Sequence, residues 1–465
     1  MTVPVFRPSS RIRSAGRSHR YRHLVASAST IDDCRALLRA APPQLTLLPF
    51  GAGQSLGDSC LNDGGALIMT RAMNRVLRLD RAAGVAIVEP GVTVGELADL
   101  GLAAPDDEPR WFPAVFPGNA GVTIAGAIAN DVHGKNHASH GSFCHHVQAL
   151  TLLRSDDGTL ECSERRNVEL FRATLGGLGL TGIIVSATLG LKRVSQPLLE
   201  CEEIRCDALA DAYPLFDASE RDWEYRFFWF DPFDPAARGV FTRARHCREP
   251  QAAVPQSWPM RAIARLPLPA VIGGPHLWRA WYRLLLARMP RRRSRHMTYR
   301  DSLAPLAEFP RWNRLLGARG LLHLQCVVAH EHAAAVLDGI LADCRNAGEL
   351  PCLASIKAFG SRPPAGLLSF PRTGVTAALD FGNAGESTRA LLRRIEGRVL
   401  DAGGAIYPAK DSTLSPQGFH RSFPAWGEFA RHVDPRFSSS FWRRVAESRR
   451  CPGTFQGNPH PVSAR

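Results

Sequence analysis

The sequence contains almost no lysine. Of its 57 basic residues only four are lysines, namely Lys135, Lys192, Lys357 and Lys410, and all the others are arginines. An ammonium group is compact and changes its pKa readily when buried, whereas a guanidinium is fork-shaped and stays charged. A chain with this bias keeps lysine where arginine cannot replace it, so we take all four as candidates for function. Codon usage is the alternative explanation for each.

The sequence also lacks the patterns of several protein classes. Its eleven cysteines are scattered and no CxxC pair occurs, so we expect buried thiols, no disulfide framework and no metal site. No run approaches the roughly 20 apolar residues of a membrane span, and no apolar run follows the basic start as in a secretory signal. We therefore expect a cytoplasmic protein, with peripheral contact to the inner face of the plasma membrane as a further possibility.

Basic residues clearly outnumber acidic ones, and the formal net charge is +14 at pH 7. Positive charge steers anionic partners but confers no specificity, and the sequence has no helix-turn-helix, zinc-finger or RRM signature. We expect no nucleic-acid partner. The length of 465 residues suits two domains, because domains commonly run to roughly 100–200 residues.

Two glycine-rich segments stand out. The first, GAGQSLGDS at 51–59, directly follows the apolar run LTLLPF, which predicts a buried strand. Its backbone N–H groups could form an anion-binding nest. It is neither a Walker loop, because no GK[ST] ends it, nor a Rossmann fingerprint, because Leu56 stands in place of the third glycine.

The second segment, FPGNAGVTIAGAIANDVHGKNHASHGSF, spans residues 116–143. It holds too many glycines for a stable exposed helix, so backbone must approach something closely there. Two such segments about 65 residues apart suggest one extended ligand, such as a dinucleotide, laid across both. Asn130, His133, Lys135 and His137 could hold its reactive ring or assist proton transfer; solvated loop side chains are the alternative.

These pieces resemble a known family. In order along residues 45–440 stand GAGQSLGDS, the 116–143 segment with its HGKNH, ELFRATLGGLGLTGII, RFFWFD, APLAEFPRWN, LHLQCVV, IKAFG and YPAKDS. The arrangement resembles the vanillyl-alcohol-oxidase (PCMH) type of FAD-binding oxidoreductase, and within it the decaprenylphosphoryl-β-D-ribose 2-oxidase family. The resemblance implies an α+β fold. It places a PCMH-type FAD-binding domain at 1–195, a substrate-binding cap domain with an antiparallel sheet and flanking helices at 196–400, and a segment returning to the FAD domain at 401–465.

The resemblance also implies roles for individual residues. FAD is expected to contact the first loop, the second segment and two more distant positions: Phe50, Gly51, Ala52, Gly53, Gln54, Ser55, Leu56, Gly57, Asp58, Ser59, Cys60, Gly118, Thr123, Ile124, Ala125, Gly126, Asn130, Asp131, Val132, His133, Ile184 and Tyr407. The substrate pocket is expected to include Trp229, Gln325, Lys357 and Lys410. Lys410 is expected to stabilise negative charge at the flavin edge, and His133 to hold the flavin or accept a proton.

Three departures from the family pattern carry further expectations. Gln54 stands where many relatives have the histidine that links covalently to the flavin, so FAD is expected to be non-covalent. Ala378 stands where mycobacterial members have a cysteine, so no nucleophile is expected there. His323 and Leu303 stand where a Gln and a Tyr are expected, which leaves the exact sugar open.

The implied activity is FAD-dependent oxidation of the 2-hydroxyl of a polyprenyl-phosphoryl ribose to the 2-keto sugar, as the first half of epimerisation to an arabinose donor. The alternative is an alditol or aldonolactone oxidase, and a flavin-free scaffold is the alternative from another class. An NADH-dependent short-chain reductase is the implied partner. The segment 276–296 mixes aromatic residues, leucines and seven arginines, which favours a contact with anionic lipid; a plain basic surface segment is the alternative.

Overall fold

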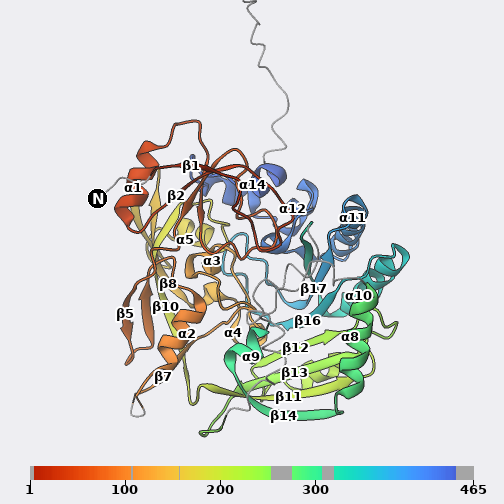
Figure 1. Cartoon of the computed structure of the whole chain (residues 1–465). Coiled ribbons are helices and arrows are strands. Elements are labelled where there is room, and N and C mark those ends of the chain that lie inside the picture. The colour runs from red at the N-terminus through yellow and green to blue at the C-terminus, as the bar shows by residue number, and fades with distance from the viewer. Residues whose placement is uncertain (1–4, 106–107, 157, 253–274, 306–318, 447–465) are drawn as a thin grey trace, which may run out of the picture.

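The structure is a computed structural model that describes residues 5–105, 108–156, 158–252, 275–305 and 319–446. Within these residues the strands form three sheets, and Figure 1 shows the N-terminal two on one side of the molecule and the third on the other. The order of the strands in the first sheet is β1-β2-β4-β3. Its elements are β1 (Arg7–Ser9), β2 (His23–Ser27), α1 (Ile31–Ala40), β3 (Leu47–Phe50) and β4 (Ala66–Met69).

Local signals account for the first sheet. The apolar run at 47–50 becomes β3, which pairs in parallel with β4 and leads straight into the first glycine loop. Thr30 caps α1: its side chain accepts from Asp33 N, while Asp33 reaches back to the cap residue. This reciprocal capping satisfies N–H groups that the first helical turn leaves free.

The second sheet is antiparallel and is built around β10, which pairs with β6, β7 and β8. Short helices cover it, and its apolar side chains pack against α2 and α3 in one core cluster. Its strands are β5 (Val76–Asp80), β6 (Val85–Val88), β7 (Arg110–Pro113), β8 (Val147–Arg154), β9 (Gly158–Ser163) and β10 (Ile183–Val194). The helices here are α2 (Val94–Leu102), α3 (Ile124–Ala129), α4 (His137–His140), η1 (Phe143–His146) and α5 (Val168–Thr174).

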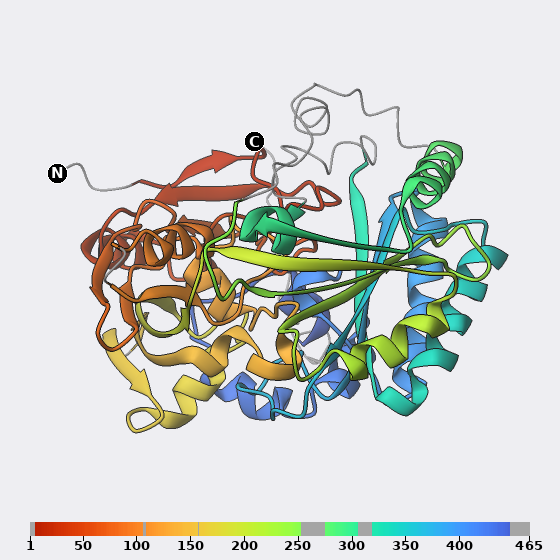
Figure 2. The same cartoon turned by 90° about the horizontal axis from the view of Figure 1, so that it is seen from below.

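The third sheet has the order β14-β11-β13-β12-β16-β17-β15-β18, with every pair antiparallel. Helices α10 and α11 lie against one side of it (Figure 2). Its strands are β11 (Leu198–Cys206), β12 (Tyr225–Phe230), β13 (Gly239–His246), β14 (Arg292–Thr298), β15 (Leu321–Val328), β16 (Leu353–Phe359), β17 (Gly374–Gly382) and β18 (Ala405–Ile406). Its helices are η2 (Leu209–Asp211), α6 (Ala212–Ala218), α8 (Pro275–Arg288), α9 (Tyr299–Leu303), α10 (His330–Asn346) and α11 (Glu386–Asp401).

The C-terminal segment joins the sheets. After β18 come η5 (Pro408–Lys410), α12 (Pro416–Ser422), α13 (Trp426–Phe429), η6 (Ala430–His432) and α14 (Ser440–Val445). While β18 pairs with β15, Phe437 bridges to Leu47 of β3, and Ser440 N donates to Leu61 O. The chain therefore passes from the third sheet back to the first.

The predicted α+β class, with an antiparallel sheet and flanking helices, is confirmed. The division at residues 195 and 400 stays a prediction. Within the second glycine segment the structure places two helices, α3 and α4, where the glycine content argued only against an exposed helix, and α3 is buried at Ile124, Ala127 and Ile128. Most of the motif APLAEFPRWN, from residue 306 onward, lies outside the described residues.

The ten described cysteines are free thiols, and all but Cys60 are buried. Of the eleven in the sequence, Cys451 lies outside the described residues. In the described part of the chain, no helix combines the length and the apolar character that crossing a bilayer requires.

Candidate active site

A cavity of about 1210 Å³ lies where the two glycine segments meet the third sheet. Its wall is also formed by the N-terminal segment from Ser10 to Arg17 and by the end of η5 at Lys410. Small-molecule pockets commonly measure roughly 300–1,000 Å³. This cavity therefore has room for a ligand as long as a dinucleotide together with a second molecule.

The first loop follows β3 and is pinned from behind by the C-terminal segment. Leu56 N donates to Ala409 O at 2.9 Å, and Gly57 lies so close to Asp411 that a Cβ atom would collide with its carbonyl oxygen. Only glycine permits that approach. Among the described residues, the N–H groups of 52–55 donate to no acceptor, so they are free to bind an anion.

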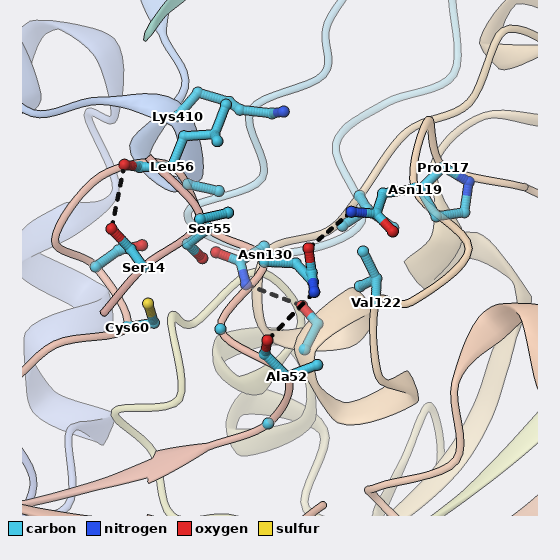
Figure 3. Close-up of a pocket in the computed structure, with 18 of the residues that line it drawn as sticks. Ser14, Ala52, Ser55, Leu56, Cys60, Pro117, Asn119, Val122, Asn130 and Lys410 are labelled. Carbon is cyan, nitrogen blue, oxygen red and sulfur yellow. Dashed lines mark hydrogen bonds between the residues drawn. The ribbon is translucent and has the colours of Figure 1, made fainter. Parts of the chain in front are cut away.

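The second segment faces the first across the cavity. Asn119 Nδ2 donates to Gln54 Oε1 at 2.7 Å (Figure 3). Thr123 caps α3 by accepting from Gly126 N at 3.2 Å, and a Cβ atom at Gly51 would collide with the Thr123 hydroxyl. The two segments therefore form one continuous cradle in which backbone, rather than long side chains, faces the ligand.

Tyr407 and His133 occupy the end of the cavity next to the third sheet. The Tyr407 hydroxyl donates to Asn130 O at 2.8 Å, and the Tyr407 ring stacks on Phe370. Gln325 Nε2 donates to His133 Nε2 at 2.9 Å and to Thr376 Oγ1 at 3.0 Å. Burial, and then the charge of Lys357, hold the pKa of His133 well below its usual value. His133 is therefore neutral, and Gln325 of β15 holds its ring in place.

Strand alternation explains which residues of the third sheet face the cavity. Successive side chains of a strand point to opposite faces. His323 and Gln325 on β15, Ser355 and Lys357 on β16, and Ala378 and Asp380 on β17 are each two positions apart and line the cavity. The residues between them pack on α10 and α11.

Three of the four lysines line the cavity: Lys135, Lys357 and Lys410. Lys357 Nζ lies 3.3 Å from His133 Nδ1. Burial, and then the charge of Lys410, lower the pKa of Lys357 to about 7. Burial also lowers the pKa of Lys410, but the carboxylate of Asp380 opposes that change. Lys357 thus exchanges its proton near neutrality, whereas Lys410 has a carboxylate that favours its charged form.

The other two lysines differ in setting. Lys135 Nζ donates to Ser302 O at 2.6 Å and lies 3.6 Å from the centre of the Phe227 ring. Burial, and then Lys357, lower the pKa of Lys135 to about 7. Lys192 is outside the cavity lining and pairs with Glu224. Lys192 therefore has a structural role, because it forms an ion pair with Glu224 away from the cavity.

His323 and Asp380 form a pair across β15 and β17. His323 Nδ1 donates to Asp380 Oδ1 at 2.6 Å, because the strand register sets the two residues opposite each other. His323 Nε2 is buried and has no hydrogen-bond partner among the described residues. Burial lowers the pKa of His323, and Asp380 opposes this. The pair fixes the carboxylate that faces Lys410.

Most residues predicted for the site line this one cavity. They are Gly51, Ala52, Gly53, Gln54, Ser55, Leu56, Ser59, Cys60, Gly118, Thr123, Ala125, Gly126, Asn130, Val132, His133, Ile184, Gln325, Lys357, Tyr407 and Lys410. Leu303 and Ala378, marked as departures, line it too.

Six predicted residues lie elsewhere: Phe50, Gly57, Asp58, Ile124, Asp131 and Trp229. Asp58 pairs with Arg444, and Asp131 accepts from Cys144 N, so both carboxylates stabilise the loops behind the cavity. Trp229 packs against a small cluster that includes Leu286 of α8 and Met289, which directly follows that helix. These residues support the site from behind.

Sequence reasoning missed several lining residues. Arg11, Arg13 and Arg17 come from the basic N-terminal stretch, which was noted only as lacking the pattern of a signal peptide. Asn119 lies within the second glycine segment but had no assigned role, and Asp380 was not singled out. The density of arginines in the N-terminal stretch was the signal that could have pointed to an anion site.

The comparisons agree with this geometry. Residues 23–163 match the family model described as FAD binding domain. The chain is 30% identical over 455 residues to decaprenylphosphoryl-beta-D-ribose oxidase of Mycolicibacterium smegmatis, covering 90% of this chain and 95% of that protein. The chain belongs to the decaprenylphosphoryl-β-D-ribose oxidase family. It is an FAD-dependent oxidoreductase that acts on CH–OH groups.

Two further relatives widen the picture of this oxidase family. The chain is 32% identical over 381 residues to an uncharacterized protein in the mprA 5′ region of Streptomyces coelicolor, covering 76% of this chain and 100% of that protein. It is 33% identical over 185 residues to L-gulonolactone oxidase of Mus musculus, covering 39% of each chain. The second match is partial, because it covers well under half of either chain.

The residues of the cavity fit FAD. The free N–H groups of 52–55 suit a pyrophosphate, and the glycines at 51 and 53 let the loop pack against Thr123 and Phe50. Where Gly118 faces the cavity, a Cβ atom would meet no atom within 4 Å. Tyr407, His133 and Lys410 line the same cavity and are the residues that would hold the flavin ring. Among the described residues, no three His, Cys, Asp or Glu side chains gather to hold a metal ion.

Proposed function

We propose that this oxidase converts the 2-hydroxyl of a polyprenyl-phosphoryl ribose to the 2-keto sugar, the first half of epimerisation to an arabinose donor. The name of the M. smegmatis relative points to a decaprenylphosphoryl ribose. The observation that carries the proposal is the charge of the cavity wall, which suits an anionic substrate better than a neutral one.

The cavity wall is rich in basic side chains, and Asp380 is the only carboxylate among the described lining residues. Six basic residues line it: Arg11, Arg13, Arg17, Lys135, Lys357 and Lys410. Burial lowers the pKa of Lys135 and Lys357 to about 7, so the three arginines and Lys410 carry the lasting positive charge. The pyrophosphate of FAD carries two negative charges and accounts for part of this excess. A buried or half-buried cation needs a partner charge to offset its desolvation. A phosphodiester in the substrate supplies one, which a neutral lactone or alditol cannot.

Each lysine has a proposed task. Bound FAD supplies the two-electron oxidant. Lys410, which Asp380 helps to keep charged, stabilises negative charge that develops at the reacting centre. Lys357 Nζ, in its neutral form, accepts the proton of the substrate hydroxyl, since its pKa lies at about 7. Gln325 holds the His133 ring through Nε2, and His133 Nδ1 contacts the Lys357 amine at 3.3 Å.

A second candidate function is oxidation of an aldonolactone or alditol. The partial match to L-gulonolactone oxidase supports it, and so does the departure of His323 and Leu303 from the expected Gln and Tyr. The two functions differ in their need for a phosphate, which a comparison of substrates can measure.

The product distinguishes the two functions directly. We would incubate the enzyme with farnesylphosphoryl-β-D-ribose, reduce the product with borodeuteride, hydrolyse the glycosyl phosphate and analyse the released pentoses by mass spectrometry. The proposal predicts deuterium at C2 in a mixture of ribose and arabinose, and no comparable oxidation of xylitol or L-gulono-1,4-lactone. Efficient oxidation of the lactone with no label from the phosphoryl sugar would instead establish the second candidate.

We further propose two partners. The first is an NADH-dependent short-chain reductase, which would complete the epimerisation. Co-incubation with such a reductase should yield the arabino product. If no such reductase accepts the 2-keto product, this partner is wrong.

The second partner is an anionic membrane surface, reached through α8. Its Leu277, Trp281 and Leu284 recur at helical spacing and are 49%, 38% and 53% exposed.

The charges around α8 refine the membrane proposal. Arg292, Arg293 and Arg295 pair with Glu202 and Glu203 of β11, so they are already neutralised. The exposed apolar residues Leu277, Trp281 and Leu284 therefore contribute more to the proposed membrane contact than the number of arginines does. Vesicles with anionic lipid should sediment the wild-type protein at low salt, and Trp281→Gln with Leu284→Gln should reduce this. Equal sedimentation of both proteins, or of neither, would remove α8 as the contact.

A further inference from the structure

The N-terminal segment from Ser10 to Arg22 lies against the cofactor loop. Ala15 N donates to Ser55 O at 2.8 Å, and the Ser14 hydroxyl donates to Leu56 O at 3.3 Å (Figure 3). Gly16 lies so close to Leu56 that a Cβ atom would collide with its carbonyl oxygen. These contacts fix the segment as part of the cavity wall.

The same segment is also tied to the third sheet. Leu321 N, at the start of β15, donates to Gly16 O at 2.7 Å. The segment thus spans from the first glycine loop to the strand that carries His323 and Gln325. Its side chains therefore line the cavity between these two parts of the wall.

Three arginines of this segment reach the cavity, namely Arg11, Arg13 and Arg17. Among the described residues, none of them forms an ion pair with a carboxylate. Arg13 and Arg17 are half-buried. Burial, and then the like charges of Arg20 and Arg17, lower the pKa of Arg13. Cations held this close together without a counter-ion indicate that an anion completes the site.

The backbone at Arg17 gives an independent observation. Its φ is +57°, in the left-handed region that residues other than glycine seldom adopt. Such a conformation is strained and is retained where the surrounding structure requires it. Here the turn Arg17 N to Ser14 O, at 3.1 Å, accompanies it, and the Arg17 side chain lines the cavity.

We propose that Arg11, Arg13 and Arg17 form a phosphate-binding site in the wall of the cavity, distinct from the N–H groups of the glycine loop. Guanidinium groups bind phosphate oxygens through paired, charge-assisted hydrogen bonds. The phosphate has two possible sources, the pyrophosphate of FAD and the phosphodiester of a lipid-linked sugar. The second source rests on the proposed function.

The test uses the FAD-loaded protein and a matched pair of variants. Arg13→Gln/Arg17→Gln removes two lining arginines. Arg7→Gln/Arg22→Gln removes two exposed arginines of the N-terminal stretch that do not line the cavity, so it controls for net charge. Each protein is titrated with farnesyl phosphate and, separately, with farnesol, and the rate of FAD release is measured on dilution. Thermal unfolding of each variant establishes that it is folded.

The site predicts a loss of phosphate binding in the first variant only. Farnesyl phosphate should bind about 10- to 100-fold more weakly, the size of a lost charged hydrogen bond or two, while farnesol binding should not change. Faster FAD release with unchanged farnesyl phosphate binding would assign the site to the cofactor's phosphate. If the lining variant matches its control in all three measurements, the phosphate site does not exist.

This result is separable from the substrate assignment. If the wild-type enzyme oxidises farnesylphosphoryl ribose but the lining variant binds farnesyl phosphate normally, the arginine site fails while the proposed function stands. If the wild-type enzyme leaves that sugar unoxidised but loses farnesyl phosphate binding on substitution, the site stands while the proposed function fails.

Discussion

At the scale of single residues, the four lysines have separated into different roles. Lys192 has an ion-pair partner in Glu224, and the other three line one cavity. The difference between Lys357 and Lys410 comes from one carboxylate: Asp380 favours the charged form of Lys410, whereas both causes acting on Lys357 lower its pKa. Two lysines in one site therefore suit opposite tasks, one as a proton acceptor and one as a fixed charge.

The pH dependence of the reaction tests the task of Lys357. A neutral amine is the accepting form, so kcat/KM should rise with pH up to about 7 and then level off. Lys357→Met should abolish that rise and lower the rate at pH 8 by about 100-fold, a usual size for a lost general base. An unchanged profile in the variant, with FAD still bound, would assign the proton to another group.

Lys410→Ala tests the fixed charge. We expect kcat to fall by about 10²- to 10³-fold, as when one preorganised electrostatic group is removed from a site. FAD content, read from the visible spectrum, should stay near that of the wild type, and Lys410→Arg should recover part of the rate. Turnover at the wild-type rate by the alanine variant would contradict the role.

Some residues of the site could be found in the sequence, and others could not. Gly51, Asn130 and Lys410 stand in motifs whose composition already indicates a function. The pairing of His323 with Asp380 depends on the register between β15 and β17, which no local pattern records. Arg13 and Arg17 line the cavity because Ala15 and Gly16, which lie between them, bond to Ser55 and Leu321, and both partners are distant in the chain.

At the scale of elements, the glycine loop depends on the C-terminal segment. Asp58 of the loop and Asp411 after η5 share Arg444 of α14 as their partner. Both carboxylates are almost fully buried, at 2% and 3% exposure. Local signals made three features predictable: the strand before the loop, the capping residues of the neighbouring helices, and the turn residues. The arrival of α14 behind the loop was not, because it depends on tertiary packing.

Gly57→Ala tests this packing. The added Cβ atom would collide with Asp411 O, so either the loop or η5 must move. Overpacking of this kind costs about 1–3 kcal/mol of stability, and FAD should dissociate faster. Gly397→Ala in α11 is the control, because its Cβ atom meets nothing within 4 Å and should stabilise the helix by about 1 kcal/mol. Equal FAD retention in both variants would contradict the close approach.

At the scale of the whole molecule, three sheets and the terminal segments enclose one cationic cavity. The order of the motifs indicates the fold because the family arranges them in that order, and the α+β class is confirmed. The assembly of the N-terminal segment, both glycine segments and η5 around one ligand is a property of the folded chain. In our proposal, the backbone N–H groups of the first loop and the three arginines of the N-terminal segment act together on anions.

The way in which FAD is held follows from this assembly. Gln54 occupies the position of a linking histidine and is engaged by Asn119 Nδ2 at 2.7 Å. An amide cannot form the covalent link, so precipitating the protein with acid should leave all the yellow colour in the supernatant as FAD. Colour that stays with the precipitated protein would show an attachment at another residue.

The most direct test of the whole account is anaerobic reduction of the bound flavin by defined substrates. The purified FAD-loaded enzyme is mixed without oxygen with farnesylphosphoryl-β-D-ribose, L-gulono-1,4-lactone or xylitol, and the visible flavin band is followed with time. The account predicts rapid bleaching by the phosphoryl sugar and little by the two neutral compounds. Bleaching by the lactone or by xylitol, with none by the phosphoryl sugar, would contradict it.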